Sequence, residues 1–149
     1  MRMSIFAAAS SSSFITEIRI AAPPAAVHAL LDDPRALIRL NPLVIGVEAG
    51  APGEFLVTDA LRMAGIPLRL RYLVRWRRDG DRIETEAESA FQTRLRNTLQ
   101  VEPDGKGSRV VETVRVTALR PFIGYVCRTA KTAHEDMLNR LKARVEAGD

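Results

Sequence analysis

Few side chains in this sequence stand where acid–base chemistry would need them. In the stretch EFLVTDAL, Asp59 shares the alternating phase of Val57 and Leu61, so it would point inward with them if this strand buries its apolar side. A carboxylate inside a cavity could act as a general base. A solvated position at a sheet edge is the alternative, because the turn MAGIP does not fix the register of this strand.

Tyr72 is the second catalytic candidate, because the inward phase of the central hairpin offers this phenol and no carboxylate. Glu112 lies in RVVETVRV, where either of two valine-bearing phases could face inward, so its direction stays open. His28 and His134 are interpreted as surface residues, the latter on the polar side of a long helix. No nucleophile with a neighbouring base can be assigned, so catalytic residues stay unknown and a non-enzyme is favoured.

The sequence offers no set of metal ligands. It has one cysteine, Cys127, and two histidines that lie far apart along the chain. An internal disulfide is therefore excluded and a Cys/His metal cluster cannot be assembled. We expect neither a metal nor a cofactor, and we interpret Cys127 as a small core residue rather than a reactive thiol.

Length and composition indicate one ordinary domain. The chain has 149 residues, of which 46% are hydrophobic, and its net charge of +4 arises from 22 bases interspersed with 18 acids. Such a diffuse excess identifies no partner. The apolar run at residues 5–9 is too short for a secretion signal, so we predict a flexible leader over 1–13, a single domain over 14–146 and a cytoplasmic location.

The periodicity of the chain changes three times. Residues 14–20 alternate as a strand does, and the proline-punctuated segment 23–41 predicts two short helices. Six strands separated by turn signals follow between residues 43 and 118. After Pro121, apolar residues recur every three or four positions in one long helix. This order predicts an α+β fold, in which a seven-stranded curved antiparallel sheet wraps around the C-terminal helix.

The hairpin at residues 69–90 carries arginines on its first half and glutamates on its second. A two-residue loop at Asp79-Gly80 would place Arg75 opposite Glu84 and continue the ladder in that register. Nearly all the charge then falls on one side of the hairpin, where opposite charges across the strands support the pairing.

Binding of nucleic acid is disfavoured by this same register. Tyr72 and Trp76 fall on the face away from the arginines, whereas a nucleic-acid surface would need aromatic and basic side chains together. The arginines that an RNA- or ribosome-docking exterior would use are Arg69, Arg77, Arg78, Arg94 and Arg96.

The inner face of the predicted sheet mixes apolar side chains with a few polar ones. Buried polar groups need partners, so these either satisfy one another and bound water or provide the polar points of an apolar ligand cavity. The residues expected to line such a cavity are Leu70, Tyr72, Val74, Trp76, Thr85, Ser89, Phe91, Leu95 and Asn97 from the strands, and Phe122, Val126, Ala130, Ala133 and Met137 from the long helix.

The first third of the chain resembles a known superfamily. The segment ITEIRIAAPPAAVHALLDDPRALIRLNPLVIGVE is similar to the start of START-like (SRPBCC) proteins, with Ala22-Pro23, Val27, Asp33-Pro34 and Pro42 at the places of that pattern. The closing TALRPFIGYV resembles the entry into their C-terminal helix. The resemblance covers about residues 14–146, and its motifs are structural rather than catalytic.

This resemblance implies a helix-grip fold over a hydrophobic cavity. It also implies binding of a lipid-like or polyketide-like small molecule, with a polyketide cyclase or dehydratase as the alternative and an RNA- or ribosome-docking protein as a second alternative. No family-wide catalytic residue exists to carry over. The expected partner is a hydrophobic ligand without stable membrane insertion, and a homodimer stays open.

Overall fold

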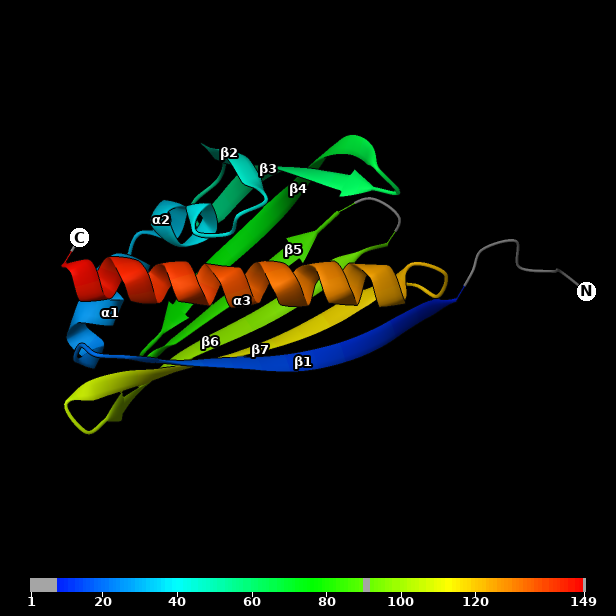
Figure 1. The fold of residues 1–149 in the computed structure, drawn as a ribbon. Helices are drawn as coiled ribbons and strands as arrows, with labels where there is room; N and C mark the ends of the chain where they lie inside the picture. The colour runs from blue at the N-terminus through cyan, green and yellow to red at the C-terminus, as the bar shows by residue number, and fades with distance from the viewer. Residues whose placement is uncertain (1–7, 90–91, 149) are drawn as a thin grey trace, which may run out of the picture.

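A computed structural model describes residues 8–89 and 92–148 of the chain. The elements in chain order are β1 (Ala9–Ile20), α1 (Pro24–Leu31), α2 (Pro34–Arg39), β2 (Val44–Ala49), β3 (Glu54–Met63), β4 (Ile66–Asp79), β5 (Arg82–Glu88), β6 (Arg94–Asp104), β7 (Gly107–Leu119) and α3 (Ile123–Ala147). The strands form one sheet in the order β1-β7-β6-β5-β4-β3-β2, with every pair antiparallel. The sheet curves around α3, while α1 and α2 lie near its C-terminal end (Figure 1). The predicted helix-grip fold is confirmed.

Strand β1 forms one edge of the sheet and pairs with β7, the last strand in the chain order. Its register runs from Ala9 opposite Leu119 to Ile20 opposite Ser108. The strand therefore begins five residues before the predicted start at Phe14, and the prediction of a flexible leader is wrong for residues 9–13. The four consecutive serines at 10–13 hid this extension, because they show no alternation of apolar and polar side chains. Residues 1–7 lie outside the described part of the chain.

The hairpin of β4 and β5 turns at Gly80-Asp81, one residue later than the predicted Asp79-Gly80. Arg75 consequently lies opposite Glu86 rather than Glu84, so the predicted register is wrong by two residues. Gly80 has a φ of 64°, which suits the first loop position of a type II′ turn, where glycine is preferred.

The face assignment of that hairpin survives the change of register. A shift of two residues leaves each side chain on its own side of the sheet, since strand side chains alternate with a period of two. Arg77 lies opposite Glu84 and forms an ion pair with it on the outer face. Trp76 lies opposite Thr85 on the inner face.

The turn between β3 and β4 decides the direction of Asp59. Ala64 and Gly65 have φ values of 51° and 79°, and positive φ at both central positions is the mark of a type I′ turn. The resulting ladder places Asp59 opposite Leu70 and Val57 opposite Tyr72. Asp59 therefore shares the inner face with the buried Val57.

The main core lies between the C-terminal half of α3, the two short helices and the strands beneath them. Its buried members are Ile20, Val27, Leu31, Leu37, Leu40, Ile83, Leu99, Val101, Val110, Met137, Leu138, Leu141 and Val145. Full burial of one such aliphatic side chain contributes about 1.5 to 3 kcal/mol. This end of the molecule therefore supplies most of the apolar stabilisation.

The N-terminal half of α3 packs less completely. Val126 and Cys127 are half-buried and contact a smaller cluster built on Val114, Val116 and Ala130. A third cluster, around Ile38, Val57 and Val74, lies on the β2–β4 side of the sheet. The closest backbone approaches of α3 are to β1 and β7. Val57 and Val74 on the inner face of β3 and β4 are therefore buried mainly by α2 and their own strand neighbours, whereas α3 covers β1 and β7.

Candidate functional site

Two inner strands bring a carboxyl and a phenol together. The Tyr72 hydroxyl donates a hydrogen bond to Asp59 Oδ1 at 2.8 Å, and Asp59 is only 7% exposed. Burial raises the pKa of Asp59, while the hydrogen bond from Tyr72 and the charge of His134 partly lower it. Burial and the neighbouring Asp59 raise the pKa of Tyr72. The alternative of a solvated Asp59 is thereby excluded.

A second polar group lies under α3. Glu112, on β7, is completely buried, and its Oε1 is 2.8 Å from Nδ1 of His134. The Thr16 hydroxyl on β1 donates to the same carboxylate oxygen at 3.4 Å. The interpretation of His134 as a surface residue is wrong, because the residue is 7% exposed. Glu112, whose direction the sequence left open, points inward with Val114.

The two polar groups share one interior. Asp59 on β3 and Glu112 on β7 both point to the inner face of the sheet, and the charge of His134 lowers the pKa of Asp59 against the larger effect of burial. Glu112 Oε2 and Asn97 Oδ1 are buried and find no hydrogen-bond partner among the described residues. An unpaired buried polar atom costs about 1 to 3 kcal/mol, so this interior would gain from a polar group placed inside it.

Most residues predicted to line a cavity lie on this inner surface or on the side of α3 that faces the sheet. Those with intermediate exposure are Leu70, Tyr72, Trp76, Thr85, Ser89, Leu95, Asn97 and Val126, and those that are buried are Val74, Ala130, Ala133 and Met137. Phe122 is different, since it precedes α3 as its N-cap and is 43% exposed. Phe91 lies outside the described residues.

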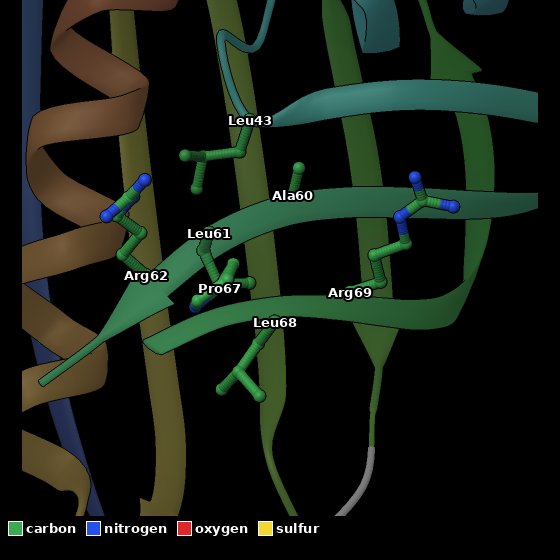
Figure 2. Close-up of a pocket in the computed structure, with 7 residues that line it drawn as sticks. All are labelled: Leu43, Ala60, Leu61, Arg62, Pro67, Leu68 and Arg69. Carbon is green, nitrogen blue, oxygen red and sulfur yellow. The ribbon is translucent and has the colours of Figure 1, made fainter. Parts of the chain in front are cut away.

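A pocket of about 580 Å³ opens at the end of the β3–β4 hairpin. Its lining residues are Leu43, Ala60, Leu61, Arg62, Pro67, Leu68 and Arg69 (Figure 2). Leu61 and Leu68 lie opposite each other in the inward phase of their strands. The Tyr125 hydroxyl of α3 donates to the carbonyl of Arg62 at 2.8 Å, which holds this end of the hairpin beside the start of the helix. None of the predicted cavity residues lines this pocket.

Sequence reasoning missed Thr16, Glu112 and His134 as members of one group. His134 follows Ala130 by four positions and precedes Leu138 by four, so it shares a helical face with two buried residues. That spacing was a usable signal. No comparable signal pairs Glu112 with His134, because their contact depends on how α3 crosses β7.

The fold and this interior define the class of protein. A seven-stranded antiparallel sheet gripping a long C-terminal helix, with two short helices after the first strand, is the START-like architecture. The chain belongs to the polyketide cyclase / dehydrase and lipid transport family, whose model matches residues 12–146. No curated protein matches it.

Solved structures resemble the chain along nearly its whole length. A protein from Thermus thermophilus is 24% identical, with a TM-score of 0.69 over 93% of this chain and 99% of that one. A START superfamily protein from Mycobacterium smegmatis is 15% identical, with a TM-score of 0.72 over 92% and 99% of the two chains. A conserved protein from Geobacillus kaustophilus is 10% identical, with a TM-score of 0.72 over 90% and 95%. At these identities the likeness establishes the fold.

None of the helices within 8–89 and 92–148 combines the length and the apolar character needed to cross a bilayer.

Proposed function

We propose that this protein binds an amphipathic small molecule between the inner face of its sheet and the N-terminal half of α3. The observation that carries this proposal is the pair of unpartnered buried oxygens, Asn97 Oδ1 and Glu112 Oε2, on a surface that is otherwise largely apolar. A few polar groups on apolar walls are typical of small-molecule sites. A ligand with a hydroxyl or amide would donate hydrogen bonds to these oxygens.

The half-exposed apolar side chains indicate where the rest of the ligand would lie. Leu95 and Val126 border the cluster under the start of α3, and Tyr72 borders the cluster on the β2–β4 side. A hydrocarbon or ring system placed between the two clusters would remove this apolar surface from water, which is favourable by about 25 cal/mol per Å². The pocket at the β3–β4 hairpin lies at the same end of the molecule and would serve as the entrance.

Energy transfer from Trp76 to a bound probe tests this proposal. Trp76 is the one tryptophan of the chain and is half-buried on the inner face. Titration with 1-anilinonaphthalene-8-sulfonate, an amphipathic fluorophore, should give saturable quenching of Trp76. Val126→Phe, which fills the proposed space, should weaken binding about tenfold.

Thr98→Val is the matched control, because Thr98 neighbours Asn97 on β6 but points to the opposite face. It should leave binding of the probe unchanged. Equal weakening of probe binding by Thr98→Val and Val126→Phe would contradict binding in the proposed interior. Native mass spectrometry of the purified protein would then show whether any small molecule co-purifies with it.

Acid–base catalysis on such a ligand is a second candidate, favoured by the buried contact between Asp59 and Tyr72. Burial raises the pKa of Asp59, which makes its carboxylate a stronger base than a solvated one. Asp59 would remove a proton next to a ligand carbonyl, and the Tyr72 hydroxyl would hold the carboxylate in place. Such proton removal is the chemistry that a cyclase or dehydratase requires.

Deuterium incorporation into 2-tetralone in D₂O, followed by proton NMR, measures this step without a known substrate. The protein should accelerate exchange next to the carbonyl, Asp59→Asn should abolish the acceleration, and Thr98→Val should retain it. Acceleration that persists in Asp59→Asn would exclude Asp59 as the base while leaving the binding proposal intact.

A further inference from the structure

The outer face of the sheet carries a row of charges that alternate in sign until the row reaches β7. The register places Glu54 opposite Arg75, Arg75 opposite Glu86, and Glu86 opposite Arg96. Two ion pairs reinforce the row, between Arg75 and Glu54 at 3.5 Å and between Arg96 and Glu86 at 3.8 Å. The next member of the row is Arg115, which lies directly opposite Arg96.

Arg115 therefore breaks the alternation. Like charges directly opposite each other on neighbouring strands destabilise the pairing. On its other side Arg115 faces Ser13 of β1, which carries no charge. Among the described residues, no carboxylate forms an ion pair with Arg115, whereas Arg94 pairs with Glu88 at 3.1 Å.

A small pocket lies at this position. It has a volume of about 220 Å³ and is lined by Arg94, Arg96, Arg115 and Thr117. The Thr117 hydroxyl is 3.0 Å from the hydroxyl of Ser11, which adds a second hydroxyl beside the arginines. Guanidinium and hydroxyl groups are the donors that bind phosphate oxygens, and the planar guanidinium can contact two of them at once.

We propose that this pocket is a binding site for a phosphoryl group carried by a small anion. The anion would occupy the position at which the row lacks a negative charge, between Arg96 and Arg115, and would accept a hydrogen bond from Thr117. The site lies on the outer face of the sheet, opposite to the interior proposed for the amphipathic ligand. It is thus independent of that function.

Thermal unfolding in phosphate, compared with chloride at equal ionic strength, tests the site. Inorganic phosphate should raise the unfolding temperature of the unaltered protein in a saturable manner. Arg115→Gln should weaken phosphate binding about tenfold, as expected for loss of a charge-assisted contact. Without phosphate, Arg115→Gln should unfold at a higher temperature than the unaltered protein, because it removes the Arg96–Arg115 repulsion.

Arg71→Gln is the matched control, since Arg71 is exposed on the same face but lies opposite Thr58 of β3. It should retain the response to phosphate. Equal responses to phosphate and chloride, or an equal loss in Arg71→Gln and Arg115→Gln, would overturn the proposal.

Two further probes distinguish the source of the phosphoryl group. Competition by glycerol phosphate against inorganic phosphate is expected for a small-anion site. Binding of a single-stranded RNA oligonucleotide or of phosphatidic acid vesicles that is insensitive to Arg115→Gln, without binding of free phosphate, would contradict it.

Discussion

The two halves of α3 bury the same sheet in different ways. Toward its C-terminus the helix places Leu138, Leu141 and Val145 in a continuous core, where almost no side-chain surface stays exposed. Toward its N-terminus it places half-exposed residues such as Val126 against the smaller cluster of Val114, Val116 and Ala130. One amphipathic helix thus serves a packed end and an incompletely packed end.

This contrast separates stability from binding within a single helix. Large buried aliphatic residues contribute to stability wherever they pack, but they leave no room for another molecule. Smaller or polar buried residues, such as Ala130 and Glu112, bury less apolar surface. Among the described residues, one oxygen of Glu112 finds no hydrogen-bond partner. The proposed ligand site lies beside half-exposed residues of α3 such as Val126, away from the fully buried core at the other end of the helix.

The largest effect on the free energy of unfolding is expected in the middle of α3, at His134. His134→Leu should lower the free energy of unfolding by about 3 to 5 kcal/mol, because it leaves Glu112 buried without its closest partner. The double variant with Glu112→Leu should recover much of that loss. Urea unfolding of both single variants and the double variant measures the coupling, and simple additivity would show that the pair does not act as a unit.

Truncation within each end tests the contrast directly. Leu138→Ala should cost about 2 to 5 kcal/mol because it opens a cavity in the packed core. Val126→Ala should cost less than about 1.5 kcal/mol, since that side chain is already half-exposed. Both are measured by urea unfolding, and equal costs would contradict the distinction between the ends.

The pH dependence of the free energy of unfolding should depend on Asp59, which lies outside the packed end of the molecule. Its folded-state pKa is raised by burial, so the folded protein binds this proton more tightly than the unfolded chain does. Its contribution to stability is fully present below the unfolded pKa and is lost as pH rises through the folded pKa. Relative to Asp59→Asn, the unaltered protein should therefore lose stability over that window and not change further above it.

The control for this measurement is Asp33→Asn, because Asp33 caps α2 at the surface. Urea unfolding at several pH values, from about pH 3 to pH 8, covers the window for a carboxyl with a raised pKa. If stability were instead lost as pH falls, the pKa of Asp59 would be lowered on folding, and the hydrogen bond from Tyr72 would outweigh burial.

The smallest effect is expected on the outer face of the sheet, which neither half of α3 covers. In a double-mutant cycle, Arg77 should couple with Glu84, whereas Arg75 should not, because only Arg77 lies opposite Glu84. The coupling should decrease with salt, as expected for exposed charges. Coupling of Arg75 with Glu84 instead would restore the register expected from an Asp79-Gly80 loop.

Much of the fold could be predicted from periodicity, and the errors have local causes. The sequence around Gly80 reads Asp-Gly-Asp, so glycine could occupy either position of a two-residue loop, and the rule that favours Asp-Gly chose the wrong one. The face assignment of Tyr72 and Trp76 was still correct, because it depends only on the parity of the register. The start of β1 was missed because serines mask alternation.

The candidate site could be predicted only in part. Asp59 and Tyr72 were named separately from their phases, but their hydrogen bond depends on the Ala64-Gly65 turn, whose type MAGIP does not specify. The contact of Glu112 with His134 joins a strand to a helix, and a crossing of this kind has no periodic signature. The alternation within one strand predicts which face each side chain occupies. It does not predict which side chains from different elements come into contact, and the candidate site depends on those contacts.

The pairing of β1 with β7 has a consequence for the order of folding. Ser11 and Thr117 are in contact although 106 residues separate them along the chain. Closing so long a loop is entropically costly, and long-range strand pairing slows folding. During synthesis β1 emerges before β7, so its backbone donors and acceptors facing β7 stay unpaired until the last strand has been made.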